Sequence, residues 1–345
     1  MSIPLILDTD FSSDVDDLGD VALACAMHKL GVVNLLCVSC DTSADKSPGA
    51  ISATMKWWGV TSPTIGTWKG STFDPGVSQN KAWRDYIYDT YDRNGVGLAS
   101  TVEDGNTTMR RALAARQRRD AVIITTGPLN AMQALMNSTA DSVSSMTGME
   151  LLAAKCKVMY AVVGIFPTGT EWNAQQHPAS ANDVAANWPT PIVWTGIEIG
   201  NTVLSGGPLT AKAADDLMRN GFSYVPASNS TRPAWGQLGI MAAAQANADF
   251  GMVRGTAAFN ASTGANTWTN SSTGNHYYLT KSYGDGHYAN RINKWICANV
   301  SASPLLSDWS QAVPAVFASA YAVRYPGAPT SLMATAGNAQ VALSW

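Results

Sequence analysis

The sequence predicts an α/β fold with a mostly parallel central sheet and helices on both of its faces. Two observations favour this class. Short apolar runs recur through the first part of the chain, and stretches with helical character separate them. These runs are continuously apolar rather than alternating, which is typical of strands that a parallel sheet buries on both faces. Strands that alternate with helices in this way indicate a parallel arrangement.

The predicted elements follow one another regularly. Apolar runs that we expect to form strands cover residues 4–10, 32–40, 121–127, 158–166 and 191–196. The stretches that we expect to form helices are 17–30, 47–58, 107–118, 128–137 and 178–187. From about residue 222 the pattern changes, and we expect a helix at 232–247, a hairpin of 251–260 with 265–280, and helices at 287–299 and 309–320. The parallel sheet therefore belongs to the earlier part of the chain.

The C-terminal stretch PGAPTSLMATAGNAQVALSW, residues 326–345, differs from everything before it. It has a Pro-rich linker, a strand, a Gly-Asn turn and a second strand, and it resembles the opening of a fibronectin type III module. Such a β-sandwich needs about 100 residues to close. We therefore expect one domain over 1–325 and a linker with a truncated fibronectin type III-like start over 326–345. An ordinary C-terminal tail is the alternative.

The composition argues against several classes of partner. The chain has 345 residues, 46% of them hydrophobic and 14% charged, with a net charge of −3. This gives no basic surface for nucleic acid and no polybasic patch for a membrane. No run approaches the roughly 18 apolar residues of a transmembrane helix, and no secretory signal opens the chain. We expect a small-molecule partner and a protein that is cytoplasmic, or virion-associated or extracellular by a non-classical route.

The stretch LILDTDFSSDVDDLGDVALA, residues 5–24, concentrates aspartates just after the first predicted strand. They are Asp8, Asp10, Asp14, Asp16, Asp17 and Asp20. Carboxylates this close raise one another's pKa unless positive charge lies among them. The chain has no lysine or arginine before Lys29, so a bound cation is the simplest counter-charge. Oxygen ligands favour Ca²⁺, with Mg²⁺ as the alternative.

Three loops are expected to meet at this edge of the sheet, because parallel sheets bind ligands beyond the carboxyl ends of their strands. They are the aspartate cluster, the loop that begins at Thr125 and Thr126, and the loop 164–173. An EF-hand is excluded, since the sixth and twelfth positions from the first aspartate are Ser13 and Gly19. A haloacid dehalogenase-type phosphatase stays as an alternative, although Ser12 stands where that family has threonine.

Five motifs in order resemble the nucleoside hydrolase family, which includes the inosine–uridine-preferring enzymes. They are DTDFSSDVDDLGDVALA, VIITTGPLNAMQAL, VVGIFPTGTEWNA, PIVWTGIEIGNTVLSG and TRPAWGQLGIMAAA, and they span roughly residues 3–300. The resemblance implies a nucleoside hydrolase-like domain over 1–325. It also implies metal-dependent hydrolysis of the N-glycosidic bond of ribonucleosides, which releases base and ribose.

The resemblance assigns the metal-binding side of the site. It implies that Asp10 and Asp17 bind calcium and that Asp10 is also the general base toward water. The backbone carbonyl of Thr126 is implied as a further ligand. Asp8, at the strand end, is expected to support or join the cluster.

The resemblance also assigns a substrate-binding side. It implies that Asp16 holds one ribose hydroxyl and that Glu171 and Asn173 hydrogen-bond the others, with a solvated loop pair as the alternative for the latter two. Trp235 is expected to stack on the base, with a packed core tryptophan as the alternative. The two remaining aspartates, Asp14 and Asp20, are expected at the helix start, where carboxylates favour the helix dipole, rather than in the site.

The sequence departs from the family pattern on the late predicted helix. Family members carry a further metal-binding aspartate there, whereas this chain has Gly236 after Trp235. Asp285 is the nearest candidate by sequence for the vacated ligand position, and Gly236→Asp is expected to raise calcium affinity. The departure favours a second hypothesis: a catalytically weakened binding or structural module, extracellular or virion-associated. Such a module would join a larger assembly through its C-terminus, and a homo-oligomer is compatible with either hypothesis.

Overall fold

The computed structural model describes residues 2–12, 14–76, 81–224, 231–245, 249–297, 333–337 and 340–344. The strands of its main sheet are β1 Ile3–Thr9, β2 Val33–Cys40, β3 Thr64–Thr67, β4 Glu103–Asp104, β5 Ala121–Thr125, β6 Cys156–Ala161, β7 Thr168–Gly169, β8 Ile192–Trp194, β11 Phe250–Phe259, β12 Asn266–Asn270 and β13 His276–Lys281. Two further pairs are β9 Leu204–Ser205 with β10 Arg232–Pro233, and β14 Met333–Gly337 with β15 Gln340–Ser344.

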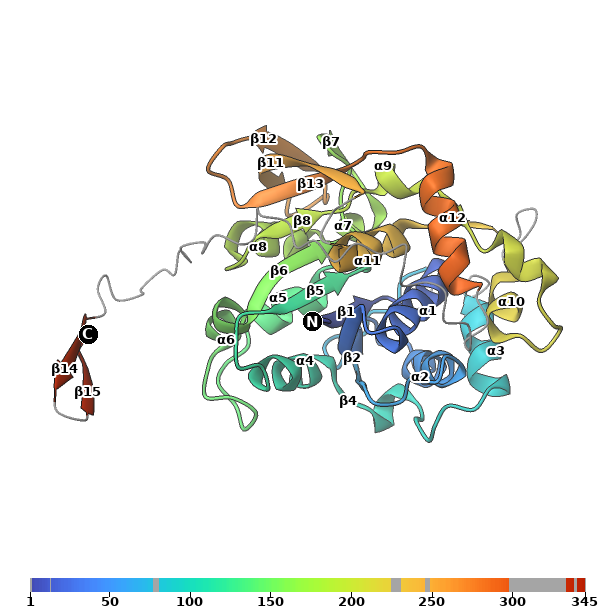
Figure 1. The fold of residues 1–345 in the computed structure, drawn as a ribbon, viewed down its shortest axis with the longest axis horizontal. Coiled ribbons are helices and arrows are strands. Elements are labelled where there is room, and N and C mark those ends of the chain that lie inside the picture. The colour runs from blue at the N-terminus through green and yellow to red at the C-terminus, as the bar shows by residue number, and fades with distance from the viewer. Residues whose placement is uncertain are drawn as a thin grey trace.

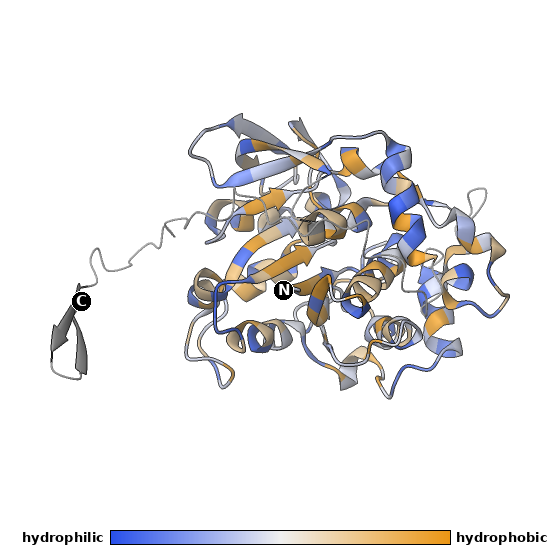
Figure 2. Cartoon of the chain, in the orientation of Figure 1, coloured by the Kyte–Doolittle hydropathy of each residue, from blue (hydrophilic) through white to orange (hydrophobic). Residues whose placement is uncertain are grey.

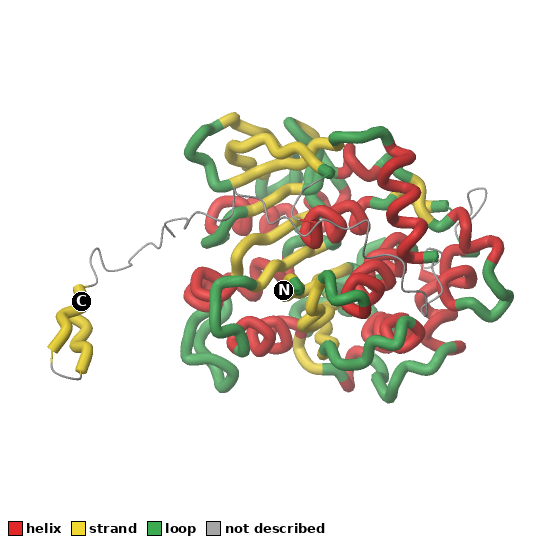
Figure 3. The backbone as a smooth tube through the Cα atoms, viewed as in Figure 1, coloured by secondary structure: helices red, strands yellow, loops and turns green. Residues whose placement is uncertain are grey.

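The helices surround this sheet (Figure 1). They are α1 Asp16–Lys29, α2 Ser47–Trp57, α3 Ala82–Thr90, α4 Gly105–Ala114, α5 Asn130–Met136, α6 Gly148–Lys155, α7 Trp172–Gln176, α8 Pro178–Asn187, α9 Ile197–Gly200, α10 Leu217–Phe222, α11 Trp235–Gln245 and α12 Asp285–Ile296. Figure 3 shows helices on both faces of the strands. Among the described residues, no helix has the length and apolar character needed to cross a membrane.

The main sheet has the order β4-β3-β2-β1-β5-β6-β8-β13-β11-β12-β7. The neighbours from β4 to β13 are parallel, and β11, β12 and β7 extend the sheet with antiparallel pairs. The predicted α/β fold with a mostly parallel sheet is therefore confirmed.

The two faces of the sheet bury separate apolar cores, because successive side chains of a strand point to opposite faces. In β1, Leu5 and Leu7 belong to the core that α1, α2, α11 and α12 cover. Ile6 belongs to the core that α4, α5, α6 and α8 cover. Figure 2 shows the central strands as predominantly hydrophobic. This burial on both faces explains the continuous apolar runs in the sequence.

The predicted strands and helices of the first part of the chain are present as β1, β2, β5, β6 and β8 and as α1, α2, α4, α5 and α8. The later segment 265–280, predicted as one strand, is two strands, β12 and β13, and β13 returns to pair in parallel with β8. The helix predicted at 309–320 and the domain boundary at 325 lie outside the described residues. The tail does form two antiparallel strands, β14 and β15, and its fibronectin-like character stays a prediction.

The strand order reverses at β1, which has β2 on one side and β5 on the other. The helix after β1, α1, packs on one face, and the helix after β5, α5, packs on the other. The two connections therefore separate at the carboxyl ends of these strands, where open α/β sheets bind ligands. In this register Asp8 lies opposite Ser39 of β2 and Thr125 of β5.

Candidate active site

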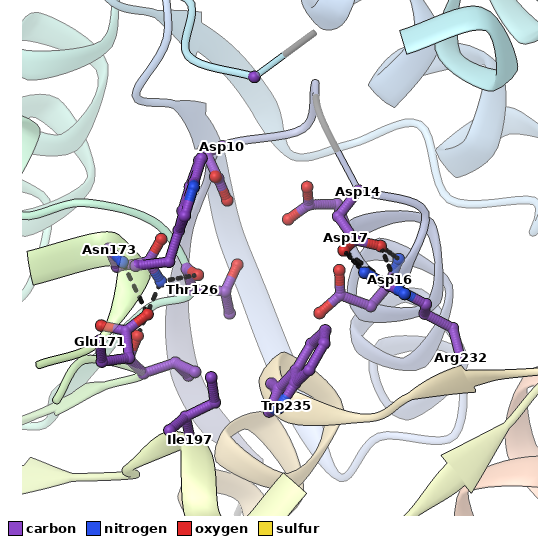
Figure 4. A pocket seen from close by; sticks show the side chains of 13 residues that line it. Asp10, Asp14, Asp16, Asp17, Thr126, Glu171, Asn173, Ile197, Arg232 and Trp235 are labelled. Carbon is purple, nitrogen blue, oxygen red and sulfur yellow. Dashed lines mark hydrogen bonds and ion pairs between the residues drawn. The ribbon is translucent and has the colours of Figure 1, made fainter. Parts of the chain in front are cut away.

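A pocket of about 330 Å³ lies at this reversal point (Figure 4). In Figure 4, Asp14, Asp16, Asp17 and Arg232 stand on one side, and Thr126, Glu171 and Asn173 stand on the other. The lining residues are Asp10, Asp14, Asp16, Asp17, Gly76, Thr126, Val162, Glu171, Trp172, Asn173, Ile197, Arg232 and Trp235. The structure thus brings together all the predicted site residues except Asp8, which is buried and does not line the pocket.

The end of β1 supplies two buried carboxylates. Asp8 is fully buried, and its Oδ2 accepts a hydrogen bond of 3.0 Å from the Thr125 hydroxyl. Burial raises the pKa of Asp8 to about 7, although that hydrogen bond lowers it. Asp10 is 6% exposed, and burial, with the charge of Asp14, likewise raises its pKa to about 7. Both groups therefore resist ionisation without a cation nearby.

The first turn of α1 supplies the next pair. Asp16 and Asp17 begin this helix, where the helix dipole favours negative charge. The Thr9 hydroxyl donates to Asp17 Oδ1 at 2.7 Å. Burial raises the pKa of both carboxyls well above the usual range, and the neighbouring aspartates raise it further. The helix start thus presents two carboxylates to the pocket at a high electrostatic cost.

Asp14 is in the pocket, so its predicted assignment to the helix start alone is wrong. Its carboxylate pairs with Arg232 of β10: the guanidinium Nε donates to Oδ1 at 2.8 Å and Nη2 donates to Oδ2. This ion pair raises the pKa of Arg232. The same guanidinium lies 5.2 Å from the ring centre of Trp235. A basic partner therefore reaches the cluster from elsewhere in the chain, but it pairs with only one aspartate.

The opposite wall is fixed by backbone contacts. The amide of Asn173 donates to the carbonyl oxygens of Thr126 and Val162, at 3.0 and 2.9 Å. Glu171 caps α7 and accepts from the backbone N–H groups of Asn173, Ala174 and Gly164 at 2.6, 3.1 and 3.0 Å. Burial raises the pKa of Glu171 to about 7, while these N–H groups lower it. The alternative of a solvated loop pair is therefore excluded.

The loop that carries Glu171 is also tied to the antiparallel end of the sheet. Strand β7 pairs with β12, and the buried Asn266 bridges the two segments. Its side-chain Oδ1 accepts a hydrogen bond from Ile165 N at 2.9 Å, and its Nδ2 donates one to Ile165 O at 2.7 Å. Its backbone carbonyl accepts a hydrogen bond from the Thr168 hydroxyl at 2.9 Å. These contacts hold the loop in one position.

Trp235 lines the pocket and also packs, partly buried, against the apolar core on that face of the sheet. It begins α11, and its indole Nε1 donates to Asn201 Oδ1 at 2.9 Å. Asp285 does not line the pocket: it begins α12, pairs with Lys281 and has a side chain that is 42% exposed. The prediction that Asp285 fills the vacated ligand position is therefore wrong.

Two buried aspartates of this region were not assigned to the site from the sequence. Asp41 directly follows β2, as Asp10 follows β1, and neither of its carboxylate oxygens has a hydrogen-bond partner. Asp20 is fully buried and lies in the second turn of α1, so its predicted place at the helix start is wrong. The position of Asp41 at a strand end was the available sequence signal.

The donor set fits a hard cation. Within the described ranges, no three His, Cys, Asp or Glu side chains already stand together as a group that could hold a metal ion. Buried oxygen atoms nevertheless lack hydrogen-bond partners around the cluster: Asp8 Oδ1, Asp20 Oδ2, both Asp41 oxygens and Thr126 Oγ1. Unpaired buried oxygens are costly unless they are protonated or bound to a cation. Ligands that are all oxygen favour Ca²⁺ or Mg²⁺.

Gly127→Ala is expected to destabilise the protein by about 1–3 kcal/mol, as overpacking of a close contact does. A Cβ at Gly127 would lie 2.3 Å from Asp41 Oδ2 and 2.8 Å from Asp10 Cβ. Urea denaturation of both proteins measures this loss. Gly286→Ala is the matched control, because apart from its neighbours along α12 no atom lies within 4 Å of its Cβ. Equal stability of the Gly127 variant and the wild type would contradict the packing described here.

Comparison with known proteins gives the fold. No protein-family profile and no curated protein matches the chain. The inosine–uridine preferring nucleoside hydrolase of Bacillus anthracis is 16% identical, with a TM-score of 0.63 over 85% of this chain and 99% of that one. The purine-preferring ribonucleoside hydrolase of Gardnerella vaginalis is 13% identical, with a TM-score of 0.62 over 85% and 98%. The type III effector XopQ, complexed with adenosine diphosphate ribose, is 11% identical, with a TM-score of 0.60 over 86% and 92%. The chain therefore has a nucleoside hydrolase-like fold.

Proposed function

We propose that this protein hydrolyses the N-glycosidic bond of ribonucleosides in a metal-dependent reaction and releases base and ribose. The observation that carries the proposal is the pocket itself. Aspartates from β1 and α1 face Glu171 and Asn173 across it, at the reversal point of a nucleoside hydrolase-like sheet. A volume of about 330 Å³ suits a small molecule.

The metal-binding side would use Asp10, Asp17 and the backbone carbonyl of Thr126, with the buried Asp8 in support or as a further member of the cluster. A bound Ca²⁺, or Mg²⁺, lowers the pKa of a water molecule and orients it. Asp10 would take a proton from the attacking water, because its carboxylate lines the pocket beside Asp17 and would be ionised next to the cation. Asp17 would stay fixed by the Thr9 hydroxyl.

The substrate side would bind ribose and base. Asp16, Glu171 and Asn173 present polar groups to the pocket that suit ribose hydroxyls, and the last two are held by backbone contacts. A site whose polar groups are already fixed loses little entropy on binding. The ring of Trp235 provides an aromatic surface on which a base can stack.

A panel of purine and pyrimidine ribonucleosides, assayed for base release with Ca²⁺, Mg²⁺ or chelator, tests the proposal. We expect hydrolysis that chelator abolishes and Ca²⁺ restores. An activated riboside with a p-nitrophenolate leaving group is included, because this group leaves without needing a proton. No release from any substrate, the activated riboside included, would contradict the proposal.

The second candidate function is a catalytically weakened module that binds nucleosides or ribose without hydrolysis, and Gly236 favours it. Calorimetric titration with ribose and nucleosides separates the two candidates, since a binding module gives saturable heat with no base released. The proposed homo-oligomer, the assembly through the C-terminus and the cellular location remain predictions.

A further inference from the structure

Asp20 is a buried carboxylate whose charge no basic group balances in the contacts that the structure describes. It is fully buried in the second turn of α1, one helical turn beyond Asp16. Its Oδ1 accepts a hydrogen bond of 2.7 Å from Gln237 Nε2, and its Oδ2 has no hydrogen-bond partner. A buried carboxylate that receives a single neutral hydrogen bond is strongly unfavourable when ionised.

The space around Asp20 exists because residue 236 has no side chain. A Cβ built on Gly236 would lie 1.8 Å from Asp20 Oδ2 and 2.4 Å from its carboxyl carbon. The Asp20 carboxylate thus occupies the volume in which a side chain at 236 would begin. Helix α11 leaves this space free at Gly236 and donates the hydrogen bond of Gln237 to the carboxylate, which α1 supplies.

Asp20 also belongs electrostatically to the aspartate cluster. Its negative charge raises the pKa of Asp16 and Asp17, and the charge of Asp10 raises the pKa of Asp20. The Thr126 side chain lies close enough to lower the pKa of Asp20. The Thr126 hydroxyl is itself buried, forms no hydrogen bond of good geometry, and belongs to a residue that lines the pocket. The Asp20 carboxylate therefore lies next to Thr126, a residue that lines the pocket.

We propose that Asp20 is a direct ligand of the cation and supplies from α1 the carboxylate that α11 lacks at Gly236. The inference rests on the metal dependence in the proposed function, but not on the identity of the substrate. It also fits glycine at position 236, because a side chain there would force the Asp20 carboxylate to move. On this proposal Gly236→Asp alone would displace the Asp20 carboxylate rather than add a further ligand.

Calorimetric titration with Ca²⁺ alone tests the role of Asp20 without any assay of activity. Asp20→Asn keeps the side-chain shape and the acceptor for Gln237, and it removes only the charge. We expect calcium affinity to fall by at least about tenfold, since even changes one shell away from a metal cost about 10–100-fold. Asp183→Asn is the matched control. Asp183 also accepts hydrogen bonds from side-chain amides, those of Gln133, Asn137 and Asn187, but it lies outside the pocket and should leave affinity unchanged.

A relocation of the carboxylate provides the second test. Asp20→Ala with Gly236→Asp moves the charge from α1 to α11 and removes the clash, so we expect the double variant to bind Ca²⁺ more tightly than Asp20→Ala alone. If Asp20→Asn does not fold, this comparison decides the proposal. Wild-type affinity in a folded Asp20→Asn, or no gain in the double variant, overturns the role of Asp20. Absence of Ca²⁺ and Mg²⁺ binding in the wild type would instead overturn the metal dependence itself.

Discussion

Asp10→Asn is expected to lower kcat/KM for nucleoside hydrolysis by about 1000-fold or more while the fold is retained. Asparagine cannot accept a proton from water, and general base catalysis contributes about 10²–10⁴-fold. The substitution also removes one negative charge from the cation site. Because burial raises the pKa of Asp10 to about 7, neutralising this group should not destabilise the protein in chelator. Initial rates of base release and thermal denaturation in chelator measure the two effects.

Asp89→Asn is the control for this experiment. Asp89 forms an exposed ion pair with Lys46 at 2.7 Å, and its side chain is 58% exposed. Exposed pairs contribute little, about 0–1 kcal/mol, so neither rate nor stability should change appreciably. An Asp10→Asn variant that keeps activity within tenfold of the wild type would disprove the assignment of Asp10 as the base.

Removal of divalent cations is expected to reverse the pH dependence of stability. Burial raises the pKa of Asp8 and Asp10 to about 7 in the folded protein, above the value of about 4 in an unfolded chain. The folded state then binds more protons than the unfolded state between these values. In chelator, the free energy of unfolding should therefore fall as pH rises from about 4 through about 7. A bound cation competes with these protons for the Asp8 and Asp10 carboxylates. In Ca²⁺, the free energy of unfolding should therefore rise with pH as these carboxyls ionise and bind the cation.

Thermal denaturation at pH 5 to 8, with chelator or with excess Ca²⁺, measures this reversal. At neutral pH, Ca²⁺ at about 100 times its Kd should add about 2.7 kcal/mol to the free energy of unfolding. We expect Tm to fall toward pH 8 in chelator and to rise in Ca²⁺. Curves that coincide with and without Ca²⁺ over the whole range would show that the aspartates do not form a cation site.

The sequence could predict the parts of the site that depend on local order. Asp10, Asp16 and Asp17 lie where a strand ends and a helix begins, and both boundaries can be read from the apolar pattern. Thr126 and Glu171 follow other strands of the same sheet, and the rule for ligand sites in parallel sheets brings them to the same edge. Those residues therefore needed no knowledge of how distant segments pack.

The parts that could not be predicted depend on contacts between distant segments. Arg232 lies 218 positions from Asp14, so the local absence of basic residues gave no sign of their ion pair. The depth of Asp20 depends on how closely α11 approaches α1, and Gly236 sets that approach. In sequence, an aspartate of the second helical turn looks the same whether solvent or another helix covers it. The prediction for Asp285 was wrong for the converse reason. It was the nearest candidate in sequence to Gly236, but the fold does not bring it to the pocket.

The bridge between β7 and β12 has a consequence for how this protein can change. The acidic half of the pocket belongs to the parallel part of the sheet. The loop that carries Glu171 is instead hydrogen-bonded to the hairpin of β11 and β12 through Asn266. The two halves thus come from different parts of the sheet, and the hydrogen bond from the Asn173 amide to the Thr126 carbonyl joins them. Substitutions or insertions in the hairpin would therefore act first on the Glu171 side of the pocket, and would reach the acidic side only through that contact. Directed evolution for a new ligand is therefore best confined to residues 250–270.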